Sequence, residues 1–182
     1  MRRIDLDIVG VFMIEPDVFE DSRGYFTESY NEDKFRQLGV DVTFIQDNHS
    51  YSAPAGTVRG LHYQLNPAAQ TKLVRVTQGA IYDVVVDIRS ISPTFGQWVG
   101  VTLSATNHRQ LYVPAGFAHG FCTLIPDTHV MYKVDRYYSR DHDRGILWSD
   151  PTLGISWPTS KVTLSEKDAQ HPNMNDAEMN FE

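Results

Sequence analysis

With 182 residues, the chain is long enough to bury the core of one domain and shows no sign of a second domain. Hydrophobic residues make up 41% and charged residues 21%, a composition that excludes a disordered chain. The formal charge of −7 argues against a nucleic-acid-binding protein, whose surface would carry basic clusters. An anionic ligand would therefore need a local basic pocket.

Cysteine content and hydropathy indicate the cellular location of the protein. The only cysteine, Cys122, cannot form a disulfide within the chain. The sequence has no N-terminal signal-like apolar region and no apolar run of about 18 residues, the length that marks a membrane span. We therefore expect a cytoplasmic protein without a membrane segment.

The first notable motif is FEDSRGYFTESYN (residues 19–31), in which Gly24 allows a turn next to Arg23. One interpretation is a turn between two edge strands. The other is a ligand-binding segment that includes Phe26 and Glu28, since a guanidinium group binds oxyanions with two hydrogen bonds. The motif alone leaves both open.

A short helix is expected from Asn31 to Leu38, with Asn31 as its N-cap and Gly39 just beyond its end. After it, apolar and β-branched runs alternate with Gly- and Pro-containing turns, which predicts β-structure. The expected strands are Thr43–Ser50, Val58–Gln64, Lys72–Thr77, Ala80–Arg89, Trp98–Ser104, Leu111–Val113, Ala118–Leu124 and Val130–Tyr138. So many short strands favour a sandwich or a barrel, and a closed barrel of this size commonly holds a ligand.

Strand alternation places Lys72 on the same face as Val74 and Val76. One interpretation is a lysine at a strand end that extends to water. The other is a cation inside a dry pocket that stabilises negative charge on a substrate oxygen.

His62 lies in VRGLHYQ (residues 58–64), and His119 lies in PAGFAHGF (residues 114–121). A histidine inside a strand is commonly a hydrogen-bonded core residue, but it can also act as a general base. Two histidines on separate strands can also bind a metal ion, although such sites usually add a closely spaced histidine pair and a carboxylate. We expect no metal here.

Arg59 and His62 have opposite parity in a regular strand, so they would face opposite sides of the sheet. Gly60 between them permits a bulge or a sharp twist that would turn one side chain toward the other's face. Tyr132 is expected to pack or to supply a proton, and Asp168, in LSEKD, lies on the surface by default.

Together, these motifs resemble the dTDP-4-dehydrorhamnose 3,5-epimerase family in order and spacing over residues 3 to 168. The resemblance is carried by DSRGYFTESYN, FIQDNHSYS, VRGLHYQ, KLVRVTQGAIYDVVVDIR, YVPAGFAHGF, YKVDRYYS, GILWSDPTLGISWP and LSEKD. It implies an all-β, cupin-type jelly-roll β-barrel with a few short helices, spanning residues 1–182 as one domain. It further implies a homodimer with exchanged N-terminal strands, while the polar tail from about residue 169 stays unassigned.

The resemblance also implies an activity and the residues that perform it. The reaction inverts C3 and C5 of dTDP-4-keto-6-deoxy-D-glucose to give dTDP-4-keto-L-rhamnose, with no cofactor and no metal. The implied catalytic residues are His62 as base, Asp168 as its partner, Tyr132 as acid and Lys72 beside the 4-keto oxygen. The implied substrate-binding residues are Arg23, Phe26, Glu28, Gln46, Asn48, Arg59, His119 and Tyr138.

Four alternatives stay open at this point. The enzyme can invert only one carbon, or act as a ketoisomerase on a related nucleotide-linked 4-keto sugar. The chain can instead be a sugar-nucleotide-binding cupin without catalytic activity. A metal-dependent oxygenase would bind a stoichiometric metal through His62 and His119.

Overall fold

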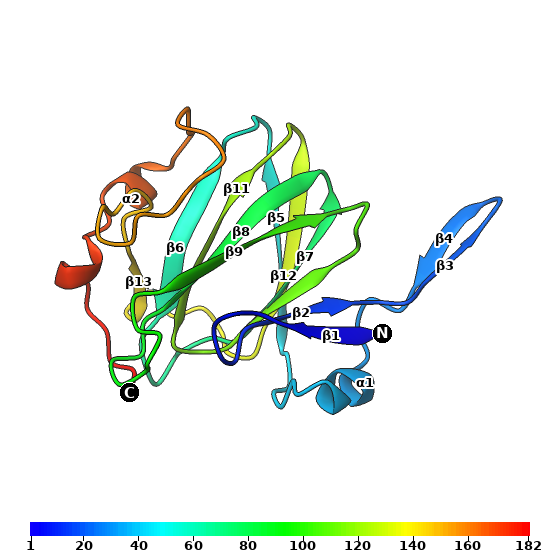
Figure 1. Cartoon of the computed structure of the whole chain (residues 1–182), viewed down its shortest axis with the longest axis horizontal. Helices are drawn as coiled ribbons and strands as arrows, with labels where there is room; N and C mark the ends of the chain where they lie inside the picture. The colour runs from blue at the N-terminus through cyan, green and yellow to red at the C-terminus, as the bar shows by residue number, and fades with distance from the viewer.

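The computed structural model describes all residues, 1–182, and consists mainly of antiparallel sheets (Figure 1). A six-stranded sheet has the order β1-β2-β10-β7-β12-β5, and a five-stranded sheet has the order β13-β6-β11-β8-β9. Their strands are β1 (Arg2–Asp5), β2 (Phe12–Glu15), β5 (Gln46–Ser52), β6 (Val58–Gln64), β7 (Lys72–Gln78), β8 (Ala80–Asp87), β9 (Trp98–Ser104), β10 (Gln110–Val113), β11 (Phe117–Thr123), β12 (Thr128–Val134) and β13 (Asp143–Gly145). The all-β class predicted from the sequence is confirmed.

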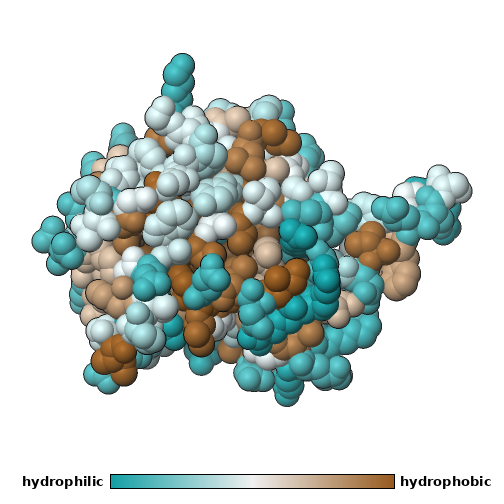
Figure 2. Space-filling model, in the orientation of Figure 1, coloured by the Kyte–Doolittle hydropathy of each residue, from teal (hydrophilic) through white to brown (hydrophobic).

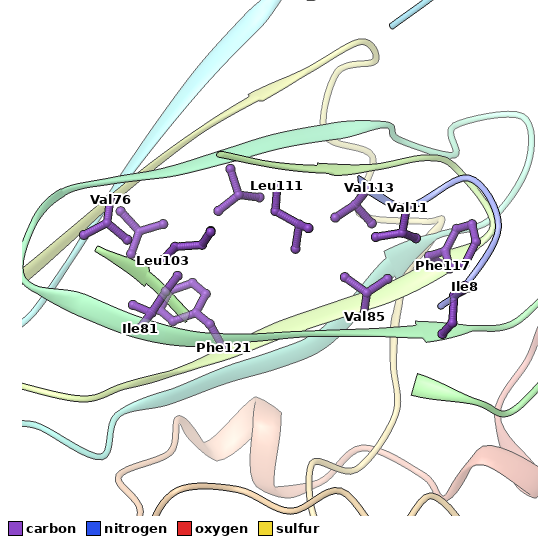
Figure 3. Packing of buried hydrophobic residues seen from close by; sticks show 12 residues of the cluster. Ile8, Val11, Val76, Ile81, Val85, Leu103, Leu111, Val113, Phe117 and Phe121 are labelled. Carbon is purple, nitrogen blue, oxygen red and sulfur yellow. The ribbon is translucent and has the colours of Figure 1, made fainter. Parts of the chain in front are cut away.

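The alternation of side chains along β8 shows why the two sheets pack face to face. Ile81 and Val85 join a buried cluster between the sheets (Figure 3), whereas Val84 and Val86 face the opposite side of β8 and join a second cluster. Because successive side chains of a strand point to opposite faces, one apolar strand contributes to both cores. The interior cluster closes the barrel, and the second cluster attaches the C-terminal part of the chain to it.

The predicted strands lie within a few residues of the observed ones, and those at 58–64 and 98–104 match in full. The strand expected at 130–138 instead ends at Val134, because the next side chain, Asp135, turns inward and accepts a hydrogen bond from the Thr71 amide (2.7 Å). The predicted helix is α1 (Glu32–Gln37), and the Asn31 side chain caps it by accepting from the Lys34 amide. None of the helices is long and apolar enough to cross a membrane.

A two-stranded hairpin, β3 (Val18–Asp21) and β4 (Gly24–Thr27), extends away from the barrel (Figure 1). The turn predicted at Gly24 is confirmed. Phe19 is 64% exposed and Phe26 is 70% exposed, and Figure 2 shows apolar surface on this arm. Solvent-exposed aromatic side chains on a projecting arm are typical of a surface that contacts a partner.

The C-terminal segment, which the sequence left unassigned, packs on the outside of the five-stranded sheet (Figure 1). It contains two short helices, α2 (Glu166–Ala169) and η1 (Met174–Asp176). Met174 and Phe181 are buried in the second cluster. The Asn180 side chain accepts a hydrogen bond from the Asn66 amide and donates one to the Asn66 carbonyl oxygen. The end of the chain is therefore part of the folded core.

We predict that Phe181→Ala lowers the free energy of unfolding by about 3 kcal/mol, the usual cost of removing a buried aromatic ring. Phe181 is 7% exposed, whereas Phe95, the matched control, is 46% exposed. Urea denaturation followed by fluorescence measures both variants. Equal stabilities of Phe181→Ala and Phe95→Ala would show that the C-terminal segment is not packed as described.

Candidate active site

A cavity of about 490 Å³ lies between the two sheets. Strands of both sheets line it, together with the segment from Thr163 to Asp168 just before and within α2. Six of the residues singled out from the sequence border or face this cavity: Arg59, His62, Lys72, His119, Tyr132 and Asp168.

Strand β6 brings Arg59 and His62 to the same cavity, although their parity predicts opposite faces. The pairing register between β6 and β11 shifts at this point, and Gly60 has a φ of +128°. A Cβ at Gly60 would lie 2.5 Å from the Cα of Gly120, so only glycine fits. The predicted irregularity is therefore confirmed, and it turns both side chains toward one space.

His62 forms a short hydrogen bond with Asp168, with 2.5 Å between Nε2 and Oδ1. Asp168 lies in α2, where the Ser165 hydroxyl accepts a hydrogen bond from the Asp168 amide and so caps this short helix. Only 4% of Asp168 is exposed, so the default surface position was wrong. The cap and the packing of the C-terminal segment place this carboxylate beside the histidine.

The environment of this pair shifts both pKa values downward. Burial of the His62 ring lowers its pKa, and the adjacent Asp168 carboxylate offsets part of that effect by stabilising the protonated ring. Burial alone would raise the pKa of Asp168, but the imidazole groups of His171 and His62 hold it well below its usual range. The pair therefore consists of a neutral imidazole and a carboxylate at neutral pH.

Lys72 lies at the start of β7 with 9% of its surface exposed, and its ammonium group donates to the His62 carbonyl oxygen (3.2 Å). The interpretation of a lysine that extends to water is wrong. Burial lowers the pKa of Lys72 to about 8, against the opposing effect of Asp83 and Asp143. At neutral pH Lys72 is thus a largely buried, poorly hydrated cation in this cavity.

Tyr132 faces the cavity from β12, on the sheet opposite His62. Burial raises the pKa of its phenol, while the nearby Arg59 guanidinium lowers it in part. Because the phenol keeps its proton at neutral pH, it can donate that proton to a bound molecule.

His119 pairs with a carboxylate that the sequence analysis missed. Its Nε2 lies 2.7 Å from Asp83 Oδ1, and Asp83 is completely buried. This pairing leaves His119 and His62 with separate carboxylate partners rather than one shared metal centre. Asp83 interrupts an apolar strand on the face of Ile81 and Val85, and that interruption was the signal available in the sequence.

The other predicted binding residues lie outside this cavity. Arg23 pairs with Asp21 near the tip of the hairpin, and Phe26 lies exposed on the same arm. Glu28 pairs with Lys34, and Tyr138 donates to Asp143. Within one chain, none of them contributes to the space occupied by His62 and Lys72.

Gln46 and Asn48 lie on β5, where Gln46 donates to the Asn48 side chain (2.8 Å) and Asn48 is opposite Tyr132 in the neighbouring strand. Alternation along β5 places them on the same face as Ser50 and Ser52, which border the cavity. These amides therefore extend the inner face of the barrel beyond the cavity.

Comparison with known proteins identifies the family. Residues 5–176 match the family described as dTDP-4-dehydrorhamnose 3,5-epimerase. The chain belongs to this epimerase family. A curated relative of that name from Sinorhizobium fredii is 53% identical, over 97% of this chain and 91% of its own length.

Solved structures of the family share the fold. The Bacillus anthracis dTDP-4-dehydrorhamnose 3,5-epimerase with TDP and PPi bound is 60% identical, with a TM-score of 0.93 over 94% of this chain and 98% of its own. The Legionella pneumophila enzyme in complex with dTDP-4-keto-L-rhamnose is 45% identical, with a TM-score of 0.92 over 96% of this chain and 93% of its own. The predicted family, isomerase class and cupin-type barrel are confirmed.

Proposed function

We propose that this epimerase inverts C3 and C5 of dTDP-4-keto-6-deoxy-D-glucose, giving dTDP-4-keto-L-rhamnose, with His62 as the base. The observation that carries the proposal is the His62–Asp168 hydrogen bond of 2.5 Å in a cavity that also contains Lys72 and Tyr132. The complex of the Legionella pneumophila relative with dTDP-4-keto-L-rhamnose supports the choice of product.

The reaction needs a base and a cation because both C3 and C5 flank the C4 carbonyl. Removal of a proton from either carbon forms an enolate whose charge collects on the C4 oxygen. Lys72, charged at neutral pH and poorly hydrated, is suited to stabilise that oxygen. Loss of one such interaction typically raises the barrier by about 3 to 4 kcal/mol.

His62 is suited to take the proton because its pKa lies below the ordinary value, so the ring is unprotonated at neutral pH and able to accept a proton. Its Nε2 is bound to Asp168, so Nδ1 is the nitrogen available to the substrate. The carboxylate also stabilises the imidazolium that forms after the proton transfer.

Inversion requires a proton donor on the face opposite the base. His62 belongs to the five-stranded sheet and Tyr132 to the six-stranded sheet, so the two side chains approach the cavity from opposite walls. A sugar ring between the walls would lose a proton to His62 and receive one from Tyr132 at C5. This geometry supports an epimerase over a cupin that merely binds the nucleotide.

We also propose a homodimer in which the β3–β4 arm completes the binding site of the partner subunit. Arg23 and Phe26 lie on an arm that projects from its own barrel (Figure 1) and that leaves 88% of the Arg23 side chain exposed. In the partner's site, Arg23 would contact the pyrophosphate and Phe26 the nucleotide. Arg59 and His119 would contact the sugar within the same chain.

Two further features belong to the proposal. The enzyme is expected to need no metal and no cofactor, since base, acid and cation are all side chains of this cavity. Its cytoplasmic location stays a prediction.

We predict that His62→Ala lowers turnover by about 100-fold or more and abolishes solvent exchange at both carbons, because it removes the only proposed base. Tyr132→Phe keeps some exchange but impairs inversion at C5. Incubation with the substrate in D₂O, followed by NMR of the product, measures exchange and configuration together. If the wild type exchanges at one carbon only, it is a single-position epimerase. A 3-keto product would indicate a ketoisomerase. Nucleotide binding without any exchange would indicate a non-catalytic cupin.

We predict a bell-shaped dependence of kcat/KM on pH. Activity falls on the acid side as His62 becomes protonated, at a pH below the ordinary imidazole range because burial lowers its pKa, and falls again above about pH 8 as Lys72 loses its proton. In Lys72→Arg the alkaline fall moves to higher pH, because arginine keeps its charge over this range. An unchanged alkaline limb in Lys72→Arg would assign that limb to another group.

We predict that inactive His62→Ala and Arg23→Ala chains complement each other when they are unfolded, mixed in equal amounts and refolded. If Arg23 acts in the partner's site, each mixed dimer contains one intact site, and the mixture regains about a quarter of wild-type activity. Activity no greater than the sum of the separate variants would place Arg23 in the site of its own chain.

A further inference from the structure

A second histidine, His171, lies next to the catalytic pair and has no role in the reaction described above. It follows Asp168 by three residues, and its Nε2 lies 3.5 Å from the same Oδ1 atom that His62 contacts. The side chain is 9% exposed, and Nε2 is buried without a hydrogen-bond partner. A buried, unpartnered ring nitrogen is costly unless it gains a ligand.

The His171 ring has a defined place against β13. A Cβ at Gly145 would lie only 2.4 Å from His171 Nε2, so the glycine provides the space for the ring. Gly145 in turn pairs with His62 in the adjacent strand β6. The two imidazole rings meet edge to face, with their centroids 5.5 Å apart.

The three side chains form a set of donors suited to a transition-metal ion. His62, Asp168 and His171 each offer one ligand atom, and these atoms lie within 4.8 Å of one another. Two imidazoles and one carboxylate form a common donor set for Zn²⁺, with bonds of about 2.0–2.2 Å. Such bonds in a tetrahedral arrangement place donors about 3.4 Å apart, close to the 3.5 Å between Asp168 and His171.

We propose that His62, Asp168 and His171 form an inhibitory binding site for Zn²⁺ or a similar divalent transition-metal ion. The ion displaces the proton that His62 Nε2 donates to Asp168, releases it to solvent and binds this nitrogen in its place, which separates Nε2 from a carboxylate oxygen that lies only 2.5 Å away in this structure. A metal-bound imidazole is a poorer base, and its carboxylate partner is occupied as well. The inhibitory effect rests on the proposed role of His62, whereas the binding itself does not.

An entry path for the ion exists outside the substrate cavity. His171 borders a second, outer cavity of about 510 Å³, which Glu166, Lys167 and Gln170 also line. The ion can therefore approach His171 from the outer surface of the five-stranded sheet, whereas His62 and Asp168 border the substrate cavity.

A surface histidine pair offers a matched control. His49 Nε2 lies 2.9 Å from His129 Nδ1 on the exposed face of β5 and β12, away from the catalytic pair. This pair can bind Zn²⁺ weakly without touching the reaction. A His49→Ala variant removes that contribution.

The test is a calorimetric Zn²⁺ titration of the full chain after chelator treatment, with activity measured in the same samples. We expect one ion per chain at the proposed site, binding weakened at least about tenfold in His171→Phe and His171→Gln, and no such change in His49→Ala. Wild-type activity falls as the site fills and returns with a chelator, whereas the His171 variants keep their own metal-free rates at that Zn²⁺ concentration.

Unchanged Zn²⁺ binding in both His171 variants would overturn the site. Two variants are used because His171→Gln keeps a polar side chain at this position and provides the test if the His171→Phe variant does not fold. If Zn²⁺ binds as expected but metal-free His62→Ala remains fully active, the site stands and the proposed function fails. The two proposals are thus tested by different measurements.

Discussion

The hydrogen bond between His62 and Asp168 is the interaction on which the proposed function of this protein depends. It joins residues 106 positions apart in the sequence, one on β6 and one on α2. The carboxylate reaches the histidine only because the C-terminal segment packs on the five-stranded sheet through Met174 and Phe181. Packing of this outer cluster therefore fixes the position of Asp168, which in turn orients the proposed base.

The barrel meets a second requirement of the proposed reaction, which is that functional side chains approach the substrate from two opposite walls. Its five-stranded sheet presents His62, Arg59 and His119, and its six-stranded sheet presents Lys72 and Tyr132. The close approach of Gly60 and Gly120 lets β6 depart from regular pleating without a steric clash. A closed barrel can thus hold the proposed acid and the proposed base apart at opposite walls of one cavity.

Local patterns in the sequence predicted the local structure well. The capping of α1 by Asn31, the alternation along β8 and the inward direction of Lys72 all depend on neighbours within a few residues. The short strands β1, β2 and β13 were missed, since three or four residues are too few to show a period. β1, with the sequence RRID, is also largely exposed, so it lacks an apolar face.

Long-range pairings were beyond the sequence patterns. The proximity of Asp168 to His62, the Asp83 partner of His119 and the placement of His171 all depend on how distant segments pack. Only the resemblance to a family suggested the first of them. Asp83 interrupts the apolar face of its strand, but this signal does not name His119 as its partner, and nothing in the sequence suggested the placement of His171. From the sequence alone, carboxylates such as these are expected on the surface, and only the fold shows that they are buried.

The most direct test of the account is an NMR titration of the His62 ring in the wild type and in Asp168→Asn, with the signal assigned by its loss in His62→Ala. The carboxylate of Asp168 stabilises the protonated ring and raises its pKa against the effect of burial. The account therefore predicts that Asp168→Asn lowers the His62 pKa further below its wild-type value. An unchanged or higher pKa in that variant would contradict the claim that Asp168 sets the basicity of His62.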